Sequence, residues 1–103
     1  MNKSEYFNKV IQIVSELYDV TEQEIISDSH IIDVVDARWI AIKLLHEKGY
    51  SSRQISTLFH KTKRCITHAL HYFRSRSEDP FSSLGNNYEI ARKLLRNIEE
   101  TSL

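Results

Sequence analysis

Basic side chains gather in the middle third of the chain, where they could bind a polyanion. Residues 43–76 contain eight Lys or Arg residues and one acid, Glu47, and so carry a formal charge of +7, although the whole protein has no net charge. Ammonium and guanidinium groups bind phosphate oxygens, and the Thr and His side chains between them can hydrogen-bond base edges or backbone oxygens. This third of the sequence predicts a nucleic-acid partner, with a merely solvated, solubilising face as the simpler alternative.

Catalysis and metal binding are not predicted. His68 and His71 have the spacing of two imidazoles on one helix face, but no carboxylate near them in sequence completes a zinc site, and a lone thiol, Cys65, excludes a Cys-based one. Cys65 stands beside basic residues that could activate a nucleophile, yet no base and no oxyanion site accompany it. A small half-buried residue is the simpler interpretation of Cys65. We expect no enzymatic activity, no metal and no cofactor.

The elements that position these side chains are predicted to be helices. Every long segment has the period of a helix and none alternates as a strand does, so we expect an all-α bundle of about five to six helices. The 103 residues, 41% of them hydrophobic with two Gly and one Pro, fit one domain over 1–103 and argue against disorder. A single Cys excludes an internal disulfide, and the absence of an apolar signal core or long apolar run predicts the cytoplasm, with association to the nucleoid.

The first half of the chain is predicted to form three helices. Apolar residues recur at helical spacing from Phe7 to Tyr18, with Ser4 as the N-cap. Thr21 begins a capping box that starts a very short helix. A longer helix over 34–48 ends at Gly49.

The second half is predicted to form three more helices. Ser52 caps a short helix through Phe59, and Thr62 caps another through about Arg74. Asp79 and Pro80 then break the chain, and a loop over 82–87 leads to a last helix over 88–98. Its inward side is predicted to hold Ile90, Ala91, Leu94, Leu95 and Ile98.

Residues 52–74 have the layout of a helix-turn-helix, two short helices joined by a turn of a few residues. In the second helix, one apolar face holds Ile66, Ala69, Leu70 and Phe73. The opposite face then presents Arg64, Thr67, His68 and His71, with Lys63 near the N-terminal end. Such a face suits the major groove of DNA, and the helix dipole adds positive potential at its first turn. Trp39 and Tyr72 are predicted to pack rather than to stack on bases.

Three stretches of the sequence resemble the C-terminal, duplex-binding domain of the bacterial replication initiator DnaA. They are residues 11–25, with IQIV and YDVT, residues 34–45, which read VVDARWIAIKLL, and residues 52–69, which begin SRQI and end ITHA. The likeness covers roughly residues 8–98. It implies a duplex-binding role for the helix-turn-helix and a phosphate contact for Arg38. It also places Lys63 and Arg64 at base-reading or backbone positions.

Several positions depart from the pattern of that family. The family's Gly-Gly-Arg-Asp-His-Thr-Thr run becomes residues 60–65 with one residue fewer, and Ser52 and Arg53 replace a Leu-Pro pair that packs on thymine methyl groups. His30 stands where the family has a minor-groove arginine, and Trp39 replaces a polar phosphate-contacting residue. No GxxxxGK[ST] loop is present, so no ATPase module is predicted. We expect a different target sequence from the family's origin box.

The leading hypothesis is a sequence-selective protein that binds double-stranded DNA and regulates replication or transcription, in a bacterial, phage or mobile-element setting. The predicted base or major-groove contacts are Lys63, Arg64, Thr67, His68, His71, Ser52 and Arg53. The predicted phosphate contacts are Arg38, Lys43, Lys61, Thr62 and Arg74. The alternative is a protein-interaction adaptor that has lost DNA binding and uses the last helix or the acidic residues 1–36, which hold eight acids and two bases.

Overall fold

The computed structural model describes residues 1–101, and within that range the chain forms helices and no strand. The helices are α1 (Lys3–Tyr18), α2 (Glu22–Ile26), α3 (Ile32–Lys48), α4 (Ser52–Phe59), α5 (Lys63–Ser77) and α6 (Leu84–Thr101). The predicted all-α class and the number of helices are confirmed. None of these helices combines the length and the apolar character that a bilayer crossing requires.

Local sequence signals set most of the helix ends. Thr21 and Glu24 form the predicted capping box, and the Thr62 hydroxyl accepts the amide proton of Cys65 at the start of α5. Gly49 ends α3 with a positive φ of 111°, a conformation that glycine adopts without a steric penalty.

Two predicted N-caps were wrong by one or two residues. The side chain of Asn2, not Ser4, accepts the backbone amide proton of Glu5 and caps α1. Ser51, not Ser52, caps α4, and it does so through a capping box with Gln54. In both cases a neighbouring residue with an equally good acceptor begins the helix earlier than the apolar pattern does.

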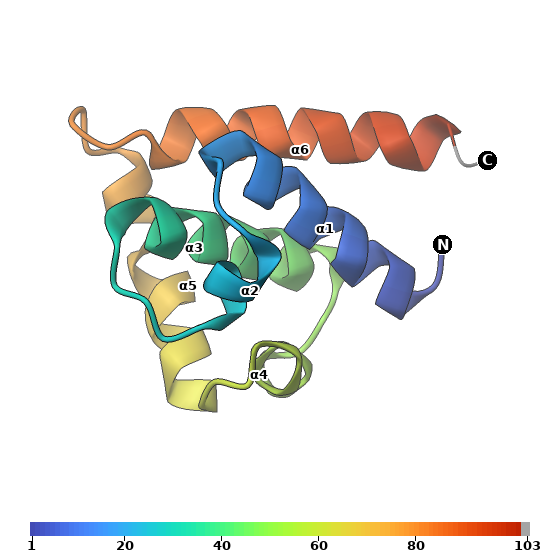
Figure 1. Cartoon of the computed structure of the whole chain (residues 1–103), viewed down its shortest axis with the longest axis horizontal. Coiled ribbons are helices and arrows are strands. Elements are labelled where there is room, and N and C mark those ends of the chain that lie inside the picture. Colours follow the sequence, from blue (N-terminus) through green and yellow to red (C-terminus); the bar gives the residue numbers. More distant parts are fainter. Residues whose placement is uncertain (102–103) are drawn as a thin grey trace.

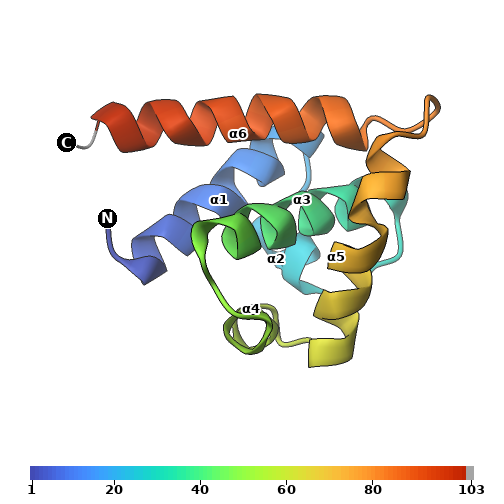
Figure 2. The same ribbon diagram turned by 180° about the vertical axis from the view of Figure 1, so that it is seen from behind.

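The core forms around α3, which packs against each of the other five helices. Ile40, Ala41 and Leu45 of this helix are completely buried. Figure 1 shows α6 along one side of the molecule, α4 on the opposite side and α5 connecting the two along an edge. Figure 2 shows the same order from behind, with α3 between α6 and α4. The core thus holds α4 and α5 at one end of the bundle.

The last helix differs from its prediction in its start and in its buried face. It begins at Leu84, which is fully buried, so most of the predicted loop over 82–87 is helical. Ala91 and Leu95 face the core as expected, but Ile90 and Leu94 are 40% and 44% exposed. The buried stripe is narrower than the apolar pattern because α6 lies on the surface of the bundle and buries only one line of side chains.

Candidate nucleic-acid interface

The connection between α4 and α5 is a tight turn of residues 60–62. His60 adopts a left-handed conformation with φ of 54°, and its amide donates to the carbonyl of Thr57 at 3.3 Å. The Lys61 amide donates to the Ser56 carbonyl at 3.1 Å, and the Ser56 hydroxyl donates to the Lys61 carbonyl at 2.6 Å. These bonds fix the angle between the two helices. Figure 1 shows α4 nearly end-on while α5 runs across the view, so the helices cross steeply.

The rotation of α5 about its axis agrees with the prediction. Ile66, Ala69 and Phe73 are 0%, 2% and 4% exposed and face the core, and Leu70 is half-buried against it. On the outward face, the exposed residues are Lys63, Arg64, Thr67, His68 and His71. The inner apolar residues therefore hold the polar row toward solvent.

Three cations of α4 and α5 keep their charge available. The side chains of Arg53, Lys63 and Arg64 are exposed, and none of them forms a hydrogen bond or an ion pair with any residue in the range 1–101. Lys63 and Arg64 extend from the first turn of α5, where unpaired amide protons add positive potential. An approaching anion meets no carboxylate bound to these three groups.

Arg38 does not have the solvent-facing position that a phosphate contact needs, so the structure corrects that prediction. The residue is 7% exposed, and its guanidinium donates to four backbone carbonyls at the end of α2 and in the loop that follows. The oxygens belong to Ile25 at 2.7 Å, Ser27 at 2.7 Å, Ser29 at 3.2 Å and Glu24 at 3.4 Å. Burial lowers the pKa of the guanidinium. Arg38 instead binds backbone carbonyls at the end of a short helix and in the loop that follows, where the hydrogen bonding of the helix stops.

Lys61 has a similar structural role, which corrects a second predicted phosphate contact. Its side chain is 10% exposed, and the ammonium donates to the Ser27 carbonyl at 2.7 Å and to the carboxylate of Asp28. The hydrogen bond from Lys61 lowers the pKa of the Asp28 carboxyl. Lys61 thus ties the turn between α4 and α5 to the loop between α2 and α3, and Asp28 neutralises its charge.

Three other predicted DNA contacts, Lys43, Arg74 and Ser52, are each less available to DNA than the sequence predicts. Lys43 is half-buried with its ammonium 5.6 Å from the ring centre of Phe73, which lies on the inner side of α5, so Lys43 is not on the outward face. Arg74 is exposed but pairs with Glu78 at 3.0 Å. Ser52 is half-buried.

Two threonine hydroxyls of the predicted interface bond their own helix. The Thr62 hydroxyl accepts from the Cys65 amide at 3.1 Å, and the Thr67 hydroxyl donates to the Arg64 carbonyl at 3.0 Å. Both residues are exposed, and Thr62 stands at the first turn of α5 beside Lys63. Each hydroxyl oxygen can still take part in a second hydrogen bond.

A row of rings crosses the outward side of α5, which the sequence analysis missed. The ring centres of His68 and Tyr72 are 4.7 Å apart, as are those of His71 and Tyr72, and the Trp39 ring contacts His68 edge-on at 6.1 Å. Trp39 packs partly against the core, and Tyr72, although 48% exposed, packs at the surface against His68 and His71, as predicted for both residues. The spacing of four residues between His68 and Tyr72 could have predicted this ring contact, because residues four apart are neighbours on a helix surface.

A buried ion pair holds α3 to α5, and it too was missed. Asp36 is 2% exposed and accepts two bonds from Arg76, at 2.8 Å from Nε and 2.7 Å from Nη2. Burial raises the pKa of the Asp36 carboxyl, and the bonds from Arg76 oppose that shift. The Arg76 guanidinium also lies 5.6 Å from the ring centre of Trp39. Partners 40 residues apart give no signal in local spacing.

Cys65 is exposed on α5, so its predicted half-buried position is wrong. Among residues 1–101 no cluster of three or more His, Cys, Asp or Glu side chains has an arrangement that could hold a metal ion. Comparison of the chain with protein-family models gives no match, and comparison with curated proteins gives none either.

Proposed function

We propose that the protein binds double-stranded DNA sequence-selectively, with α5 in the major groove and the N-terminal part of α4 at the phosphate backbone, as in a helix-turn-helix. The observation that supports this most directly is the outward face of α5. There Lys63 and Arg64 are exposed and unpaired at the end of a helix that the core holds from behind. The resemblance of the sequence to the duplex-binding domain of DnaA supports the same role.

The contacts divide into two kinds in this proposal. Arg64, with Thr67 and His68 one turn further along α5, reads base edges. Lys63 and Arg53 bind phosphates and position the helix. A protein of this kind, without an ATPase module, acts as a regulator of replication or transcription.

Selection of sequences from a random duplex pool, followed by titration at several salt concentrations, tests the proposal. The two cations assigned to phosphates, Lys63 and Arg53, predict that log K falls with log salt at a slope of about −1.8, because each neutralised phosphate contributes about −0.9. Arg64→Ala is expected to weaken the selected site by roughly 1–3 kcal/mol and to relax one position of it. Lys63→Gln is expected to weaken all sequences equally and to reduce the slope by about 0.9.

Lys93→Gln is the matched control, because Lys93 is an exposed lysine on α6, on the opposite side of the bundle from α4. It is expected to leave both affinity and slope unchanged. A flat salt response, or a selection that enriches no sequence, refutes the proposal. Equal weakening of all sequences by Arg64→Ala assigns Arg64 to the backbone instead of a base.

An adaptor that binds another protein is the second candidate, and the exposed side of α6 favours it. Ile90 and Leu94, one turn apart, are 40% and 44% exposed on a helix whose other side packs on the core. This candidate predicts a partner that remains bound after nuclease treatment and is lost from the Ile90→Ser, Leu94→Ser double variant. Loss of the partner on nuclease treatment alone contradicts it.

A further inference from the structure

A cavity of about 430 Å³ opens between the first turn of α1 and α4, apart from the outward face of α5. Lys3 and Ser4 of α1 line one side, and Arg53, Thr57 and Leu58 of α4 line the other, with Tyr50 between them. The volume lies in the range of small-molecule sites. An occupant would contact two helices that belong to distant parts of the sequence.

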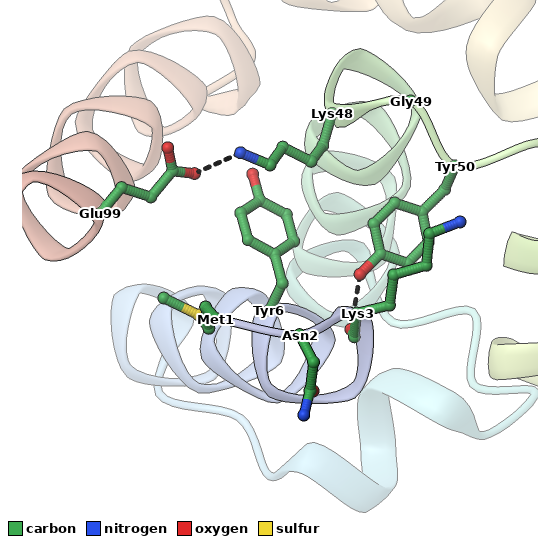
Figure 3. Close-up of a pocket in the computed structure, with 8 residues that line it drawn as sticks. All are labelled: Met1, Asn2, Lys3, Tyr6, Lys48, Gly49, Tyr50 and Glu99. Carbon is green, nitrogen blue, oxygen red and sulfur yellow. Dashed lines mark hydrogen bonds and ion pairs between the residues drawn. The ribbon is translucent and has the colours of Figure 1, made fainter. Parts of the chain in front are cut away.

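The cavity carries two positive charges and no negative one. Lys3 and Arg53 are exposed and form no ion pair within residues 1–101, and no Asp or Glu is among the lining residues. The Lys3 ammonium lies 5.2 Å from the ring centre of Tyr50, whose hydroxyl donates to the Lys3 carbonyl at 2.5 Å. Figure 3 shows the Lys3 side chain beside that ring. The ring contact leaves the ammonium protons able to bind an anion.

The adjoining cavity, of about 330 Å³, shares Lys3 and Tyr50 but has a different charge balance. There Lys48 pairs with the carboxylate of Glu99 at 3.5 Å (Figure 3). A carboxylate in the wall repels an anionic ligand, and here it also neutralises Lys48. The charges therefore favour the cavity between α1 and α4 for an anion.

The rest of the lining is mainly apolar. Leu58 is half-buried against the core, and the Tyr50 ring is 4% exposed and stacks on Tyr6 with ring centres 6.0 Å apart. Ser4, Gln54 and Thr57 are the polar, uncharged residues of the lining, and the Thr57 hydroxyl donates to the Arg53 carbonyl at 3.1 Å. Apolar surface with a few charged groups is the usual composition of a site for a small amphipathic molecule.

We propose that this cavity is a binding site for a small organic anion with a flat apolar body, such as an aromatic carboxylate. The carboxylate binds Lys3 and Arg53, and the apolar body lies against Leu58. This site does not depend on the proposed DNA-binding function, and its test uses the protein without DNA.

The test is a titration of the full chain, labelled with ¹⁵N, followed by amide chemical shifts. The probes are phenylacetate, its uncharged analogue phenylacetamide, and inorganic phosphate. Phenylacetate is expected to bind with shift changes confined to the first turn of α1, Tyr50 and α4. Phenylacetamide and phosphate are each expected to bind about tenfold more weakly, since one lacks the charge and the other the apolar body.

Two variants test whether the charge of Lys3 itself contributes to binding. Lys3→Gln is expected to weaken phenylacetate binding about fivefold, the size of one exposed charge contact. Lys9→Gln is the matched control, because Lys9 is an exposed lysine of the same helix that does not line this cavity. The amide spectra of both variants also show whether each is folded. Equal binding of phenylacetamide, shift changes scattered over the surface, or equal affinity of the two variants overturns the proposal.

Discussion

Replacing Arg38 with alanine separates a structural role from a DNA contact. The guanidinium donates to four backbone carbonyls, two of them at 2.7 Å, and the residue is 7% exposed. Arg38→Ala removes the donors and leaves the Ile25 carbonyl without its partner, whereas the Ser27 carbonyl keeps its bond from the Lys61 ammonium. Backbone oxygens that lose their partners in a poorly hydrated position destabilise the folded state.

The magnitude follows from the number and length of these bonds. A hydrogen bond from a charged donor stabilises a protein by roughly 1.5–3 kcal/mol. The 2.7 Å bond to the Ile25 carbonyl contributes this much, and the bond to the Ser27 carbonyl, which Lys61 also binds, adds less. The bonds at 3.2 and 3.4 Å are long and add less. The free energy of unfolding of a small domain is about 5–15 kcal/mol, so Arg38→Ala removes a large part of the stability.

Urea unfolding followed by circular dichroism measures this loss, with Arg53→Ala as the matched variant. Arg53 is an exposed arginine without a partner in residues 1–101, so its replacement changes the free energy of unfolding by less than about 0.5 kcal/mol. Under the proposed function, Arg53→Ala is expected to weaken DNA binding instead. If Arg38→Ala costs less than about 1 kcal/mol and reduces the affinity of the folded protein for DNA, the structural assignment of Arg38 is refuted.

Three further predictions concern other parts of the fold. Gly85→Ala is expected to destabilise the protein by roughly 1–3 kcal/mol in urea unfolding, because its new Cβ would lie 2.4 Å from the Ser77 carbonyl oxygen, and an unchanged midpoint contradicts the close approach. Burial and the hydrogen bond to Glu47 raise the pKa of Tyr88 above its ordinary 10.0. Above pH 10 the Tyr88 phenol therefore ionises in the unfolded chain before it ionises in the folded protein. The stability that Tyr88 contributes is present below pH 10 and falls as the pH rises above it. Tyr88→Phe is expected to flatten that decline, and a parallel decline in both proteins contradicts the assignment. Cys65 is the only thiol and is exposed on α5, so duplex DNA of the selected sequence is expected to slow its reaction with a maleimide, and an unchanged rate places α5 outside the interface.

Sequence reasoning predicted those features of the fold that depend on neighbouring residues. The capping box of Thr21 and Glu24, the positive φ of Gly49 and the apolar line of Ile66, Ala69 and Phe73 each follow from side chains within two turns of one another. The start of α6 did not follow in this way, because its first turn contains Gly85 and two Asn residues with low helix propensity. Burial of Leu84 and the close packing of Gly85 on α5 outweigh that propensity.

The sequence predicted the position of those site residues whose role depends only on being exposed. It did not predict the role of residues that bind a partner far away in the chain. The outward position of Arg64 and His71 follows from the period of α5 alone. Arg38 and Lys61 look equally available in the sequence, but their partners in the loop after α2 lie 9 to 14 and 33 to 34 residues away. Spacing within a helix carries no information about such pairs.

The formal charge of residues 43–76 is therefore larger than the charge that is free to bind a polyanion. Of the eight bases in residues 43–76, four form ion pairs with Glu99, Asp28, Glu78 and Asp36. Lys43 is half-buried over an inner ring, which leaves Arg53, Lys63 and Arg64. If all eight bases neutralised phosphates, the salt slope would be about −7, whereas the two unpaired cations assigned to phosphates, Arg53 and Lys63, give about −1.8. A slope near the larger value would mean that the ion pairs open on DNA, and their carboxylates would then have to move away from the phosphates.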